Sequence, residues 1–474
     1  MSLTSLLGLL IISILVGRVA HSRWRLYLLL AVSAGSVYAL QPALPIRYLD
    51  FWLPTCTLGI AVLGWILTTA SEKRNWKANW PALAVLISII LGLGLTRFSG
   101  LDLPLTASRP PAFEKIIIAL AVTTLLAGLL AKTTSASKGV VAAAIVLLLI
   151  LFAGLKIPGM TEAISQALRS LNQQSTALAS SFDIRWLGFS YIAFRLIHTL
   201  RDRQAGRLPD VSLAEYIVYL VFFLALVAGP IDRIERFIGD LRKPAGADPG
   251  DVFEAGKRIL LGLFKKFVIA DTLGLIALNG VNAYQVQTPL WAWVLLYGYS
   301  LQIYFDFSGY TDMAIGMGNF LGIRLPENFS APYRKPNLTL FWNNWHMTLT
   351  QWFRAYYFNP LTRALRSQLK QASIPAIIFV TQISTMVLIG LWHGVTWNFV
   401  LWGLWHGLGL FIHNRWSEWT RPWAASVPPR MQSGLKVSGI LITFNFVALG
   451  WALFALPSLD ATWSFVQVLF GVGL

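Results

Sequence analysis

The feature that most constrains this chain is a series of apolar runs whose lengths suit a lipid bilayer. A hydrocarbon core about 30 Å thick is crossed by about 20 mostly apolar helical residues. Hydrophobic residues make up 56% of the 474 residues and charged residues only 12%, whereas a soluble domain carries about 25% charged residues. The runs are Leu3–Ala20, Arg25–Leu40, Phe51–Ala70, Pro81–Leu95, Lys115–Ala131, Gly139–Leu155, Trp186–Leu200, Ala214–Pro230, Leu260–Leu278, Pro289–Phe307, Pro375–Trp392, Trp397–His413 and Leu435–Ala455.

These runs predict an all-α, polytopic transmembrane protein. We expect about 11–13 spans, together with helices that are re-entrant or lie at the membrane interface. In the first run the basic residues Arg18, Arg23 and Arg25 follow the apolar stretch, whereas a secretory signal peptide has them in front. The first run is therefore interpreted as a spanning helix with the N-terminus outside.

The formal net charge of +17 comes from basic residues spread over many short loops. This distribution does not indicate nucleic-acid binding, but it fits the excess of Lys and Arg in cytoplasmic loops of membrane proteins. With the N-terminus outside, the first four inside connections carry twelve basic residues and the three outside connections carry seven. The inside residues are Arg18, Arg23, Arg25, Lys73, Arg74, Lys77, Lys132, Lys138, Arg195, Arg201, Arg203 and Arg207, and the outside ones are Arg47, Arg97, Arg109, Lys115, Lys156, Arg169 and Arg185.

The simple alternation breaks after Pro230, where GPIDRIERFIGDLRKPAGADPGDVFEAGKR contains six basic and six acidic residues. Residues 308–358 are then dense in aromatic and polar side chains and are interrupted by prolines. Irregular backbone is tolerated at membrane depth only where protein buries it or where it lines a cavity. We therefore expect simple transmembrane helices over 1–180, a central body with a cavity over 185–455, and an apolar C-terminal segment over 456–474. Residues 156–182 fit a surface amphipathic helix.

The histidines are the first candidates for chemistry. His21 lies among basic loop residues and fits a solvated position. Each other histidine, taken alone, fits a packing residue that hydrogen-bonds a neighbouring helix, although polar groups in a membrane are functional candidates by default. On a straight helix His406 lies about 220° from His393, so the two cannot face one site unless the helix breaks. His406 and His413, seven residues apart, share a face and are interpreted as packing or interface residues.

Two histidines stand out by their context. His393 lies between Gly390 and Gly394, and small residues let another helix or a ligand approach the backbone. His346 lies in an aromatic and polar stretch, eight residues before Arg354. On a helix, eight residues place Arg354 about 80° past two full turns, so it is offset from His346 but able to line one side of the same cavity.

Three aspartates, Asp271, Asp306 and Asp312, fall in apolar contexts. A charged Asp at the centre of a membrane helix costs about 2.5–3.5 kcal/mol on insertion scales, so each needs a partner or a role. For Asp271 we expect a structural role as an ion pair or a helix N-cap, because Lys265 and Lys266 lie one to two helical turns away.

The sequence contains no P-loop, no G-x-S-x-G and no H-E-x-x-H. No pair of the candidate ligands has the short spacing typical of zinc sites, so we expect no metal. A neutral imidazole in a dry, aromatic cavity remains. Histidine suits general-base catalysis near neutral pH, because its pKa of about 6.5 lets it accept and return a proton. A matching task is to deprotonate a hydroxyl while that hydroxyl attacks an acyl thioester.

Three ordered motifs resemble the bacterial membrane-bound O-acyltransferases, in the branch of alginate O-acetyltransferases and D-alanyl-lipoteichoic acid transferases. The motifs are YFDFSGYTDMAIGMGNFLGIRLPENFSAPY (304–333), FWNNWHMTLTQWFRAYYFNPL (341–361) and GLWHGVTWNFVLWGLWHG (390–407), and VAGPIDRIERF (227–237) is similar to the same branch. The resemblance covers roughly 185–455. Where the branch commonly has an acidic residue and a glycine pair, this chain has Ala355 and Thr362–Arg363.

The resemblance implies that His393 is the essential catalytic histidine and that His346 is also required. It implies helices around a funnel or tunnel, in which a cytoplasmic acyl thioester meets a hydroxyl acceptor or a partner protein at the outer side. We further expect the cavity to be shaped and the substrates to be bound by a set of polar and aromatic residues. These are Tyr304, Asp306, Asn344, Trp345, Arg354 and Trp392.

The resulting hypothesis is a multi-pass O-acyltransferase of the bacterial cytoplasmic membrane that transfers an acyl group, in first place acetyl, toward an exported polysaccharide or envelope glycan. Acetyl-CoA or an acyl-carrier protein is the expected co-substrate, no cofactor is tightly bound, and membrane lipids and an esterase-like extracytoplasmic protein are expected partners. Transfer of D-alanyl or another short acyl group to teichoic acid or lipid is an alternative. A non-catalytic flippase for a lipid-linked glycan, or a scaffold for a periplasmic transferase, would not require His346 and His393.

Overall fold

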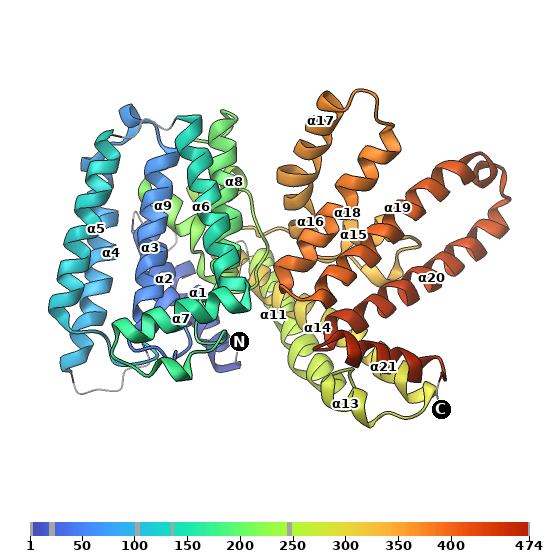
Figure 1. Ribbon diagram of the computed structural model, residues 1–474. Helices are drawn as coiled ribbons and strands as arrows, with labels where there is room; N and C mark the ends of the chain where they lie inside the picture. The colour runs from blue at the N-terminus through green and yellow to red at the C-terminus, as the bar shows by residue number, and fades with distance from the viewer. Residues whose placement is uncertain (1–2, 19–23, 100–104, 134–136, 244–248, 473–474) are drawn as a thin grey trace. The chain divides into compact units, whose positions relative to one another are not determined.

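The computed structural model describes residues 3–18, 24–99, 105–133, 137–243 and 249–472. All regular secondary structure in these ranges is helical (Figure 1), which confirms the predicted all-α class. By contacts, the chain forms two compact units. Unit 1 comprises Met1–Lys257 and Ala314–Leu325, and unit 2 comprises Arg258–Met313 and Pro326–Leu474. The predicted division near residue 180 stays a prediction.

Unit 1 is a bundle in which α3, α4, α5, α6 and α8 run side by side while α7 runs across them (Figure 1). Its core is α9, every residue of which is buried; α9 packs against α2, α3 and α4. The helices are α1 (Leu3–Arg18), α2 (Arg25–Ala39), α3 (Leu49–Thr68), α4 (Trp76–Leu95), α5 (Phe113–Thr133), α6 (Lys138–Lys156), α7 (Pro158–Leu171), α8 (Phe189–Gln204), α9 (Leu213–Leu220) and α10 (Ile234–Arg242). α11 (Pro249–Leu263) begins in unit 1 and continues into unit 2 after Lys257.

The start of α9 shows how the sequence sets a helix boundary. The Ser212 side chain accepts a hydrogen bond from the Glu215 backbone N–H, and the Glu215 carboxylate accepts one from the Ser212 backbone N–H. This capping box satisfies two donors that the first turn of a helix leaves unpaired. α9 ends at Leu220, so the apolar run predicted over Ala214–Pro230 is not one helix. A short 3₁₀ turn (Phe223–Ala225) and extended backbone complete it.

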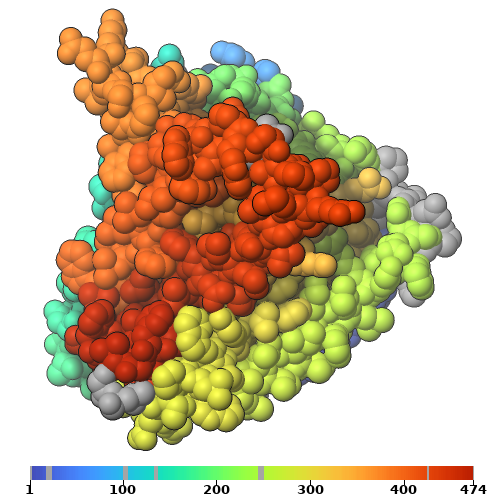
Figure 2. Space-filling model, turned by 90° about the vertical axis from the view of Figure 1, so that its right-hand side faces the viewer, coloured from blue at the N-terminus to red at the C-terminus, as the bar shows by residue number. Residues whose placement is uncertain are grey.

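Unit 2 contains the long helices α18, α19 and α20 and the part of α14 up to Met313, and α18 packs closely along α19. Figure 2 shows the face covered by α18–α20 in orange and red, with α13 in yellow beside α21. The helices are α12 (Asp271–Gly274), α13 (Gly280–Gln285), α14 (Pro289–Phe320), α15 (Leu338–Asn344), α16 (Met347–Phe353), α17 (Asn359–Gln368), α18 (Ile374–His393), α19 (Trp397–Ser426), α20 (Pro429–Ala455) and α21 (Leu459–Leu469).

Six of the described helices are long and apolar enough to cross a membrane. Two of them, Phe113–Lys132 and Lys138–Lys156, have only 6% and 11% of their residues buried in the protein. Bare apolar faces of this extent are stable against lipid and not against water. The other runs form helices that are shorter, interrupted or more polar. The polytopic membrane architecture is therefore confirmed. The other four of the six spans are Leu49–Thr68, Trp76–Phe98, Ile374–His393 and Pro429–Ala455.

The stretch 308–358 is only partly as irregular as its sequence predicts. It begins as a continuous helix, because α14 extends to Phe320, and it then becomes extended before the short helices α15 and α16. Two segments are π-helical, Phe264–Ala270 and Arg354–Phe358. Such turns hold one residue more than an α-helical turn and frequently occur at functional sites.

Candidate active site

His393 is the last residue of α18, directly before the short break that separates α18 from α19. A Cβ atom on Gly390 would lie 2.1 Å from the carbonyl oxygen of Phe399, and one on Gly394 would lie 2.6 Å from the Phe399 ring. Both contacts are shorter than real Cβ atoms make. The two glycines therefore allow the start of α19 to approach the histidine segment, as their positions beside His393 predicted.

The His393 imidazole lies within an aromatic wall. Its ring centroid is 4.5 Å from that of Trp392, 4.7 Å from Phe454, 5.7 Å from Trp402 and 6.0 Å from Phe399. His393 itself is only half-buried. The imidazole is thus surrounded by apolar rings but is not sealed off by packed helices.

His346 is held by an unusual backbone conformation. It precedes α16 with φ +42° and is 4% exposed. A residue with a side chain seldom adopts this left-handed conformation, and such strain concentrates at functional sites. Asn328 anchors the segment, because its backbone oxygen accepts from the Met347 N–H at 2.9 Å and its side chain accepts from Thr348.

The contacts of Asn328 also define the proton position on His346. The Asn328 Oδ1 accepts from the Thr348 backbone N–H at 3.2 Å, so this atom is the oxygen of the amide. His346 Nδ1 lies 3.2 Å from the same Oδ1 and must therefore be the protonated nitrogen that donates to it. Nε2 consequently carries the lone pair, and this buried atom has no hydrogen-bond partner among the described residues. Burial lowers the pKa of His346 to about 3, so the ring is neutral at physiological pH.

Trp392 brings the two predicted histidines into one site. Its ring contacts His393 and lies 6.2 Å from the ring of His346. His346 also packs against Phe307 at 4.8 Å. Although 47 positions separate His346 from His393, the structure places both against the same indole, as the resemblance implied.

Two further predicted residues belong to an aromatic stack next to His346. Trp345, 4% exposed, contacts Tyr304 at 6.2 Å and Trp451 at 5.1 Å. Tyr304 also contacts Tyr333 at 5.6 Å. These residues shape the wall of the site. Asn344 does not face the histidines through its amide, which donates to the Leu340 carbonyl at 2.8 Å within α15.

Arg354 lies in a separate cavity of about 410 Å³ in unit 2. Its Nη2 donates to Asn343 Oδ1 at 2.6 Å. The described residues that line this cavity include neither His346 nor His393, so the expectation that Arg354 lines the same cavity as His346 is not met. The lining does reach Ile389, one helical turn before His393 on α18. The basic and acidic lining residues are Arg354, Arg415, Glu418 and Arg421.

The aspartates in apolar contexts, Asp271, Asp306 and Asp312, differ in their partners. Lys266 forms an ion pair with Asp306, and Lys265 pairs with Asp312 at 2.7 Å. Both lysines leave from the π-helical segment Phe264–Ala270 and reach α14. The predicted pairing of Asp271 with these lysines is therefore wrong, because α14 supplies their counter-ions.

The sequence allowed His406 and His393 to face one site only if the helix between them breaks. The structure has this break, between α18 and α19. Both rings contact Trp402, at 4.9 Å and 5.7 Å. His406 is completely buried among aromatic rings, and neither of its nitrogens has a hydrogen-bond partner in the described part of the chain. His413 instead lies 3.2 Å from Thr339 Oγ1. His21 falls outside the described residues.

Sequence reasoning missed several residues of the site. Asn328, Phe399, Trp402 and Phe454 contact the histidines but were not singled out. Asn328, Phe399 and Trp402 stand within the quoted motifs, which is the signal that marks them. Reasoning from sequence also passed over His198, whose i,i+4 neighbour Asp202 lies 2.9 Å from its Nε2 in unit 1.

Comparison with known proteins assigns most of the chain to one family. Residues 135–455 match the family described as MBOAT, membrane-bound O-acyltransferase. The matched segment includes both histidines of the candidate site and the aromatic residues around them. The match covers more than half of the chain.

Individual relatives agree with this assignment. The teichoic acid D-alanyltransferase of Streptococcus thermophilus is 32% identical over 57% of this chain and 68% of its own length. The peptidoglycan O-acetyltransferase of Helicobacter pylori is 34% identical over 54% of this chain and 47% of its own length. A Pseudomonas aeruginosa protein named "Probable alginate O-acetylase AlgI" is 32% identical over 60% and 52%. The chain thus spans about half to two thirds of these relatives. It belongs to the membrane-bound O-acyltransferase family of acyltransferases.

Proposed function

We propose that this chain transfers an acyl group, in first place acetyl, from a cytoplasmic thioester to a hydroxyl of an exported polysaccharide or envelope glycan, directly or through a partner protein. The observation that supports this proposal best is that two imidazoles contact Trp392. His393 is half-buried, and the Nε2 of His346 is buried and has no hydrogen-bond partner among the described residues. A hydroxyl acceptor supplies the proton that such nitrogens accept.

His393 takes the part of general base. Its imidazole accepts the proton of the acceptor hydroxyl while the hydroxyl oxygen forms a bond to the thioester carbonyl carbon. The carbon–sulfur bond then breaks, and the departing thiolate takes the proton back from the imidazolium. The ring is neutral again, the acyl group is on oxygen, and no covalent enzyme intermediate is formed.

His346 has a different role from His393, because its ring is buried and already holds its proton in the hydrogen bond to Asn328. Burial disfavours the charged imidazolium that a general base becomes. A neutral imidazole held by Asn328 is, however, a well-oriented hydrogen-bond acceptor. His346 therefore positions the acceptor hydroxyl through Nε2.

The 410 Å³ cavity supports entry of the donor from the cytoplasm. The helix ends beside this cavity carry several basic residues, whereas the connections 394–396 and 456–458 at the other ends of α18 and α20 carry none. By the positive-inside rule, we infer that the end with the basic residues faces the cytoplasm. Arg354, Arg415 and Arg421 against the single Glu418 give the cavity a positive balance that suits the phosphates of a thioester carrier. The basic residues at the helix ends are Arg363, Arg366, Lys370, Arg421 and Arg430. The cytoplasmic-membrane location and the outside N-terminus stay part of the proposal and rest on the loop charges of the N-terminal helices.

D-alanyl transfer is the second candidate. It is favoured by the match to the streptococcal teichoic acid D-alanyltransferase, 68% of whose length the chain covers. The two candidates differ in the thioester used, so membranes containing the protein are supplied with acetyl-CoA or with a D-alanyl carrier-protein thioester. The acyl group recovered on the glycan fraction identifies the donor.

The decisive experiment is His393→Ala in the full chain. We expect acyl transfer to fall by about 10²–10⁴-fold, the range contributed by a positioned acid–base group, with unchanged abundance in the membrane. His413→Ala is the matched control, because it removes an imidazole from α19 outside the aromatic site. Normal transfer by a correctly inserted His393→Ala protein overturns the catalytic assignment and leaves a flippase or a scaffold.

A further inference from the structure

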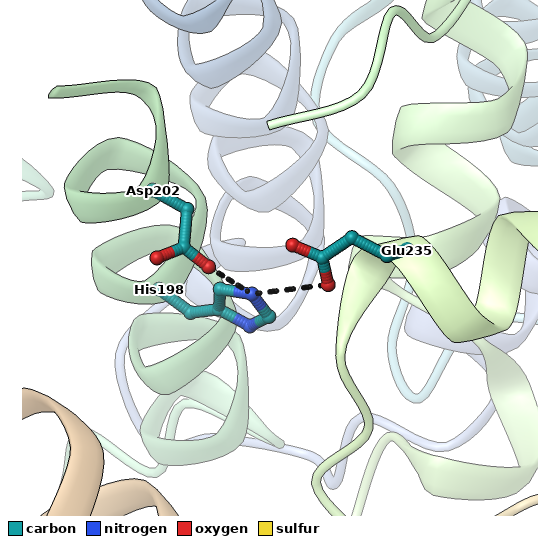
Figure 3. A group of neighbouring side chains, drawn as sticks. All are labelled: His198, Asp202 and Glu235. Atoms are coloured by element: carbon teal, nitrogen blue, oxygen red, sulfur yellow. Dashed lines mark ion pairs between the residues drawn. The ribbon is translucent and has the colours of Figure 1, made fainter. Parts of the chain in front are cut away.

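Unit 1 contains a second cluster of titratable groups, formed by His198, Asp202 and Glu235 (Figure 3). His198 and Asp202 are one turn apart on α8, and Glu235 lies in the first turn of α10. The His198 Nε2 is 2.9 Å from Asp202 Oδ2 and 4.0 Å from Glu235 Oε2. One nitrogen therefore faces two carboxylates that belong to different helices.

The other side of the ring fixes its proton. The Tyr219 hydroxyl donates to the backbone oxygen of Asp232 at 2.9 Å, so its single hydrogen is used there. The same hydroxyl lies 3.2 Å from His198 Nδ1 and must accept from it, which places a proton on Nδ1. With the proton on Nδ1, Nε2 presents its lone pair to the two carboxylates. One nitrogen and two carboxylate oxygens thus face a common point, which is the arrangement of a cation site.

The arrangement matches the way proteins prepare a histidine ligand. A metal-binding imidazole usually donates its other N–H to a neighbouring acceptor, which fixes the tautomer and the ring orientation. Tyr219 has this role here. The side chains of His198 and Asp202 are 1% and 2% exposed, whereas that of Glu235 is 38% exposed, so the cluster opens to its surroundings at Glu235.

The distances suit a first-row divalent cation. Tetrahedral ligands about 2.1 Å from zinc stand about 3.4 Å apart. The three ligand atoms of the cluster lie within 4.8 Å of one another, with separations of 2.9 and 4.0 Å from Nε2. Shifts of less than about 1 Å bring them to this spacing, and a water completes the coordination. Imidazole and carboxylate together favour Zn²⁺ or Mn²⁺ over Ca²⁺.

The two carboxylate oxygens of Asp202 have different neighbours. Its Oδ1 accepts from Arg207 Nη2 at 2.7 Å, and its Oδ2 faces the imidazole. The neighbouring carboxylate, Asp232, is held by Arg236 at 2.8 Å instead. Asp232 is thus committed outside the cluster, and the candidate ligands are His198 Nε2, Asp202 Oδ2 and Glu235 Oε2.

We propose that His198, Asp202 and Glu235 bind a divalent transition-metal cation, of the class of Zn²⁺ or Mn²⁺, that ties α8 to α10. The site lies within unit 1 and is independent of the acyl-transfer proposal. It departs from the expectation, drawn from sequence spacing, that the chain holds no metal.

The test uses the untagged full chain in detergent, stripped with a chelator. Calorimetric titration with ZnCl₂ and with MnCl₂ measures affinity, and the visible absorption of added Co²⁺ reports coordination. We expect one equivalent to bind the wild type and Glu235→Gln to weaken binding by at least about 10-fold, since even a supporting residue of a metal site contributes about 10–100-fold. Tyr219→Phe, which keeps all three ligands, should weaken binding within that range.

Glu254→Gln is the matched control, because this carboxylate on α11 is 65% exposed and pairs with Lys257. It should leave binding unchanged. Since Glu235 is half-exposed, its variant should keep the thermal midpoint of the metal-free wild type, which separates lost affinity from lost folding. Absence of stoichiometric binding to the wild type, or equal binding by Glu235→Gln and the wild type, overturns the proposal and assigns the cluster to a proton shared between His198 and the carboxylates.

Discussion

The imidazoles of the two units have opposite surroundings. His346 and His393 in unit 2 lie against Trp392, Phe307 and other aromatic rings, whereas His198 in unit 1 faces two carboxylates. Aromatic walls disfavour charge on the ring, so the first pair is suited to accept a proton or a hydrogen bond briefly and return it. Carboxylates favour a positive partner, so the second site is suited to hold a cation. Histidine is thus suited to proton transfer in unit 2 and to cation binding in unit 1.

After His393→Ala, the largest expected effect comes from removing Nε2 of His346 without disturbing its backbone. Asparagine tolerates a positive φ, so His346→Asn keeps the left-handed conformation and removes the acceptor. We expect acyl transfer to fall by about 10²-fold, because a buried hydrogen-bond partner that is lost costs up to about 3 kcal/mol, measured on glycan from cells with equal membrane abundance. Transfer within a few-fold of the wild type would remove His346 from the site.

A smaller effect is expected from the residue that positions His346. Asn328→Leu removes the oxygen that accepts from Nδ1, and loss of one buried hydrogen-bond partner costs about 1–3 kcal/mol. We expect kcat to fall about 10-fold with little change in KM. Asn328→Asp restores an acceptor and adds a negative charge that raises the pKa of His346, so it should recover part of kcat with an altered pH profile. A purely structural role would show no such change in the profile.

The next effect is on stability. In Gly390→Ala the new methyl group meets the Phe399 carbonyl at 2.1 Å, and overpacking of this kind costs about 1–3 kcal/mol. The thermal midpoint in detergent should fall, and transfer should fall with it because His393 shifts. Gly434→Ala is the control, since no atom lies within 4 Å of its added methyl group. Equal midpoints for the two variants would show that the approach of α19 to His393 is loose.

The smallest effect concerns a carboxylate of unit 1 that has a permanent cation. Burial raises the pKa of Asp183, but hydrogen bonds from Arg169, Ser165 and the Ser180 backbone and the charge of Arg169 bring the net pKa below its usual 3.8. A lowered folded-state pKa means stability that is present at higher pH and is lost as pH falls through the folded pKa. The thermal midpoint should therefore drop by a few degrees below about pH 4, independently of added metal.

Asp183→Asn tests the origin of this drop. The variant should be less stable than the wild type at neutral pH and should lose its own acid-dependent step. If the step persists in Asp183→Asn, another carboxylate causes it, and Asp202 is the first to examine, because its counter-ions include the titratable His198.

Much of this could be predicted from the sequence, for reasons that differ by element. Apolar runs of membrane length predicted α3–α6, α18 and α20, because lipid selects such helices by length and composition alone. The candidate site residues His346 and His393 were predicted from the sequence motifs that contain them. The prediction of one spanning helix over 214–230 was wrong, because α9 is a short helix buried in the core of unit 1. A helix buried in protein has the same apolar residues as a helix that faces lipid.

The contacts between different helices could not be predicted from the sequence. Helix periodicity placed Lys265 and Lys266 near Asp271, but the facing carboxylates of α14 provide their partners. The same periodicity offset His406 from His393, but the break after His393 redirects α19 toward Trp402. Only the i,i+4 spacing of His198 and Asp202 could have been noticed, and Glu235 comes from another helix.

The π-helical segment Phe264–Ala270 has a consequence for how the chain tolerates change in length. Its wide turn accommodates one surplus residue, and Lys265 and Lys266, adjacent in sequence, thereby serve Asp312 and Asp306 on one facing helix. Deleting a single residue here lets the turn tighten into α-helical form and leaves α12 in phase with its neighbours. The same deletion within α18 rotates Trp392 and His393 by about 100°. A deletion in this segment therefore disturbs the helices of unit 2 less than one in α18, and its main cost is the loss of the paired register of Lys265 and Lys266.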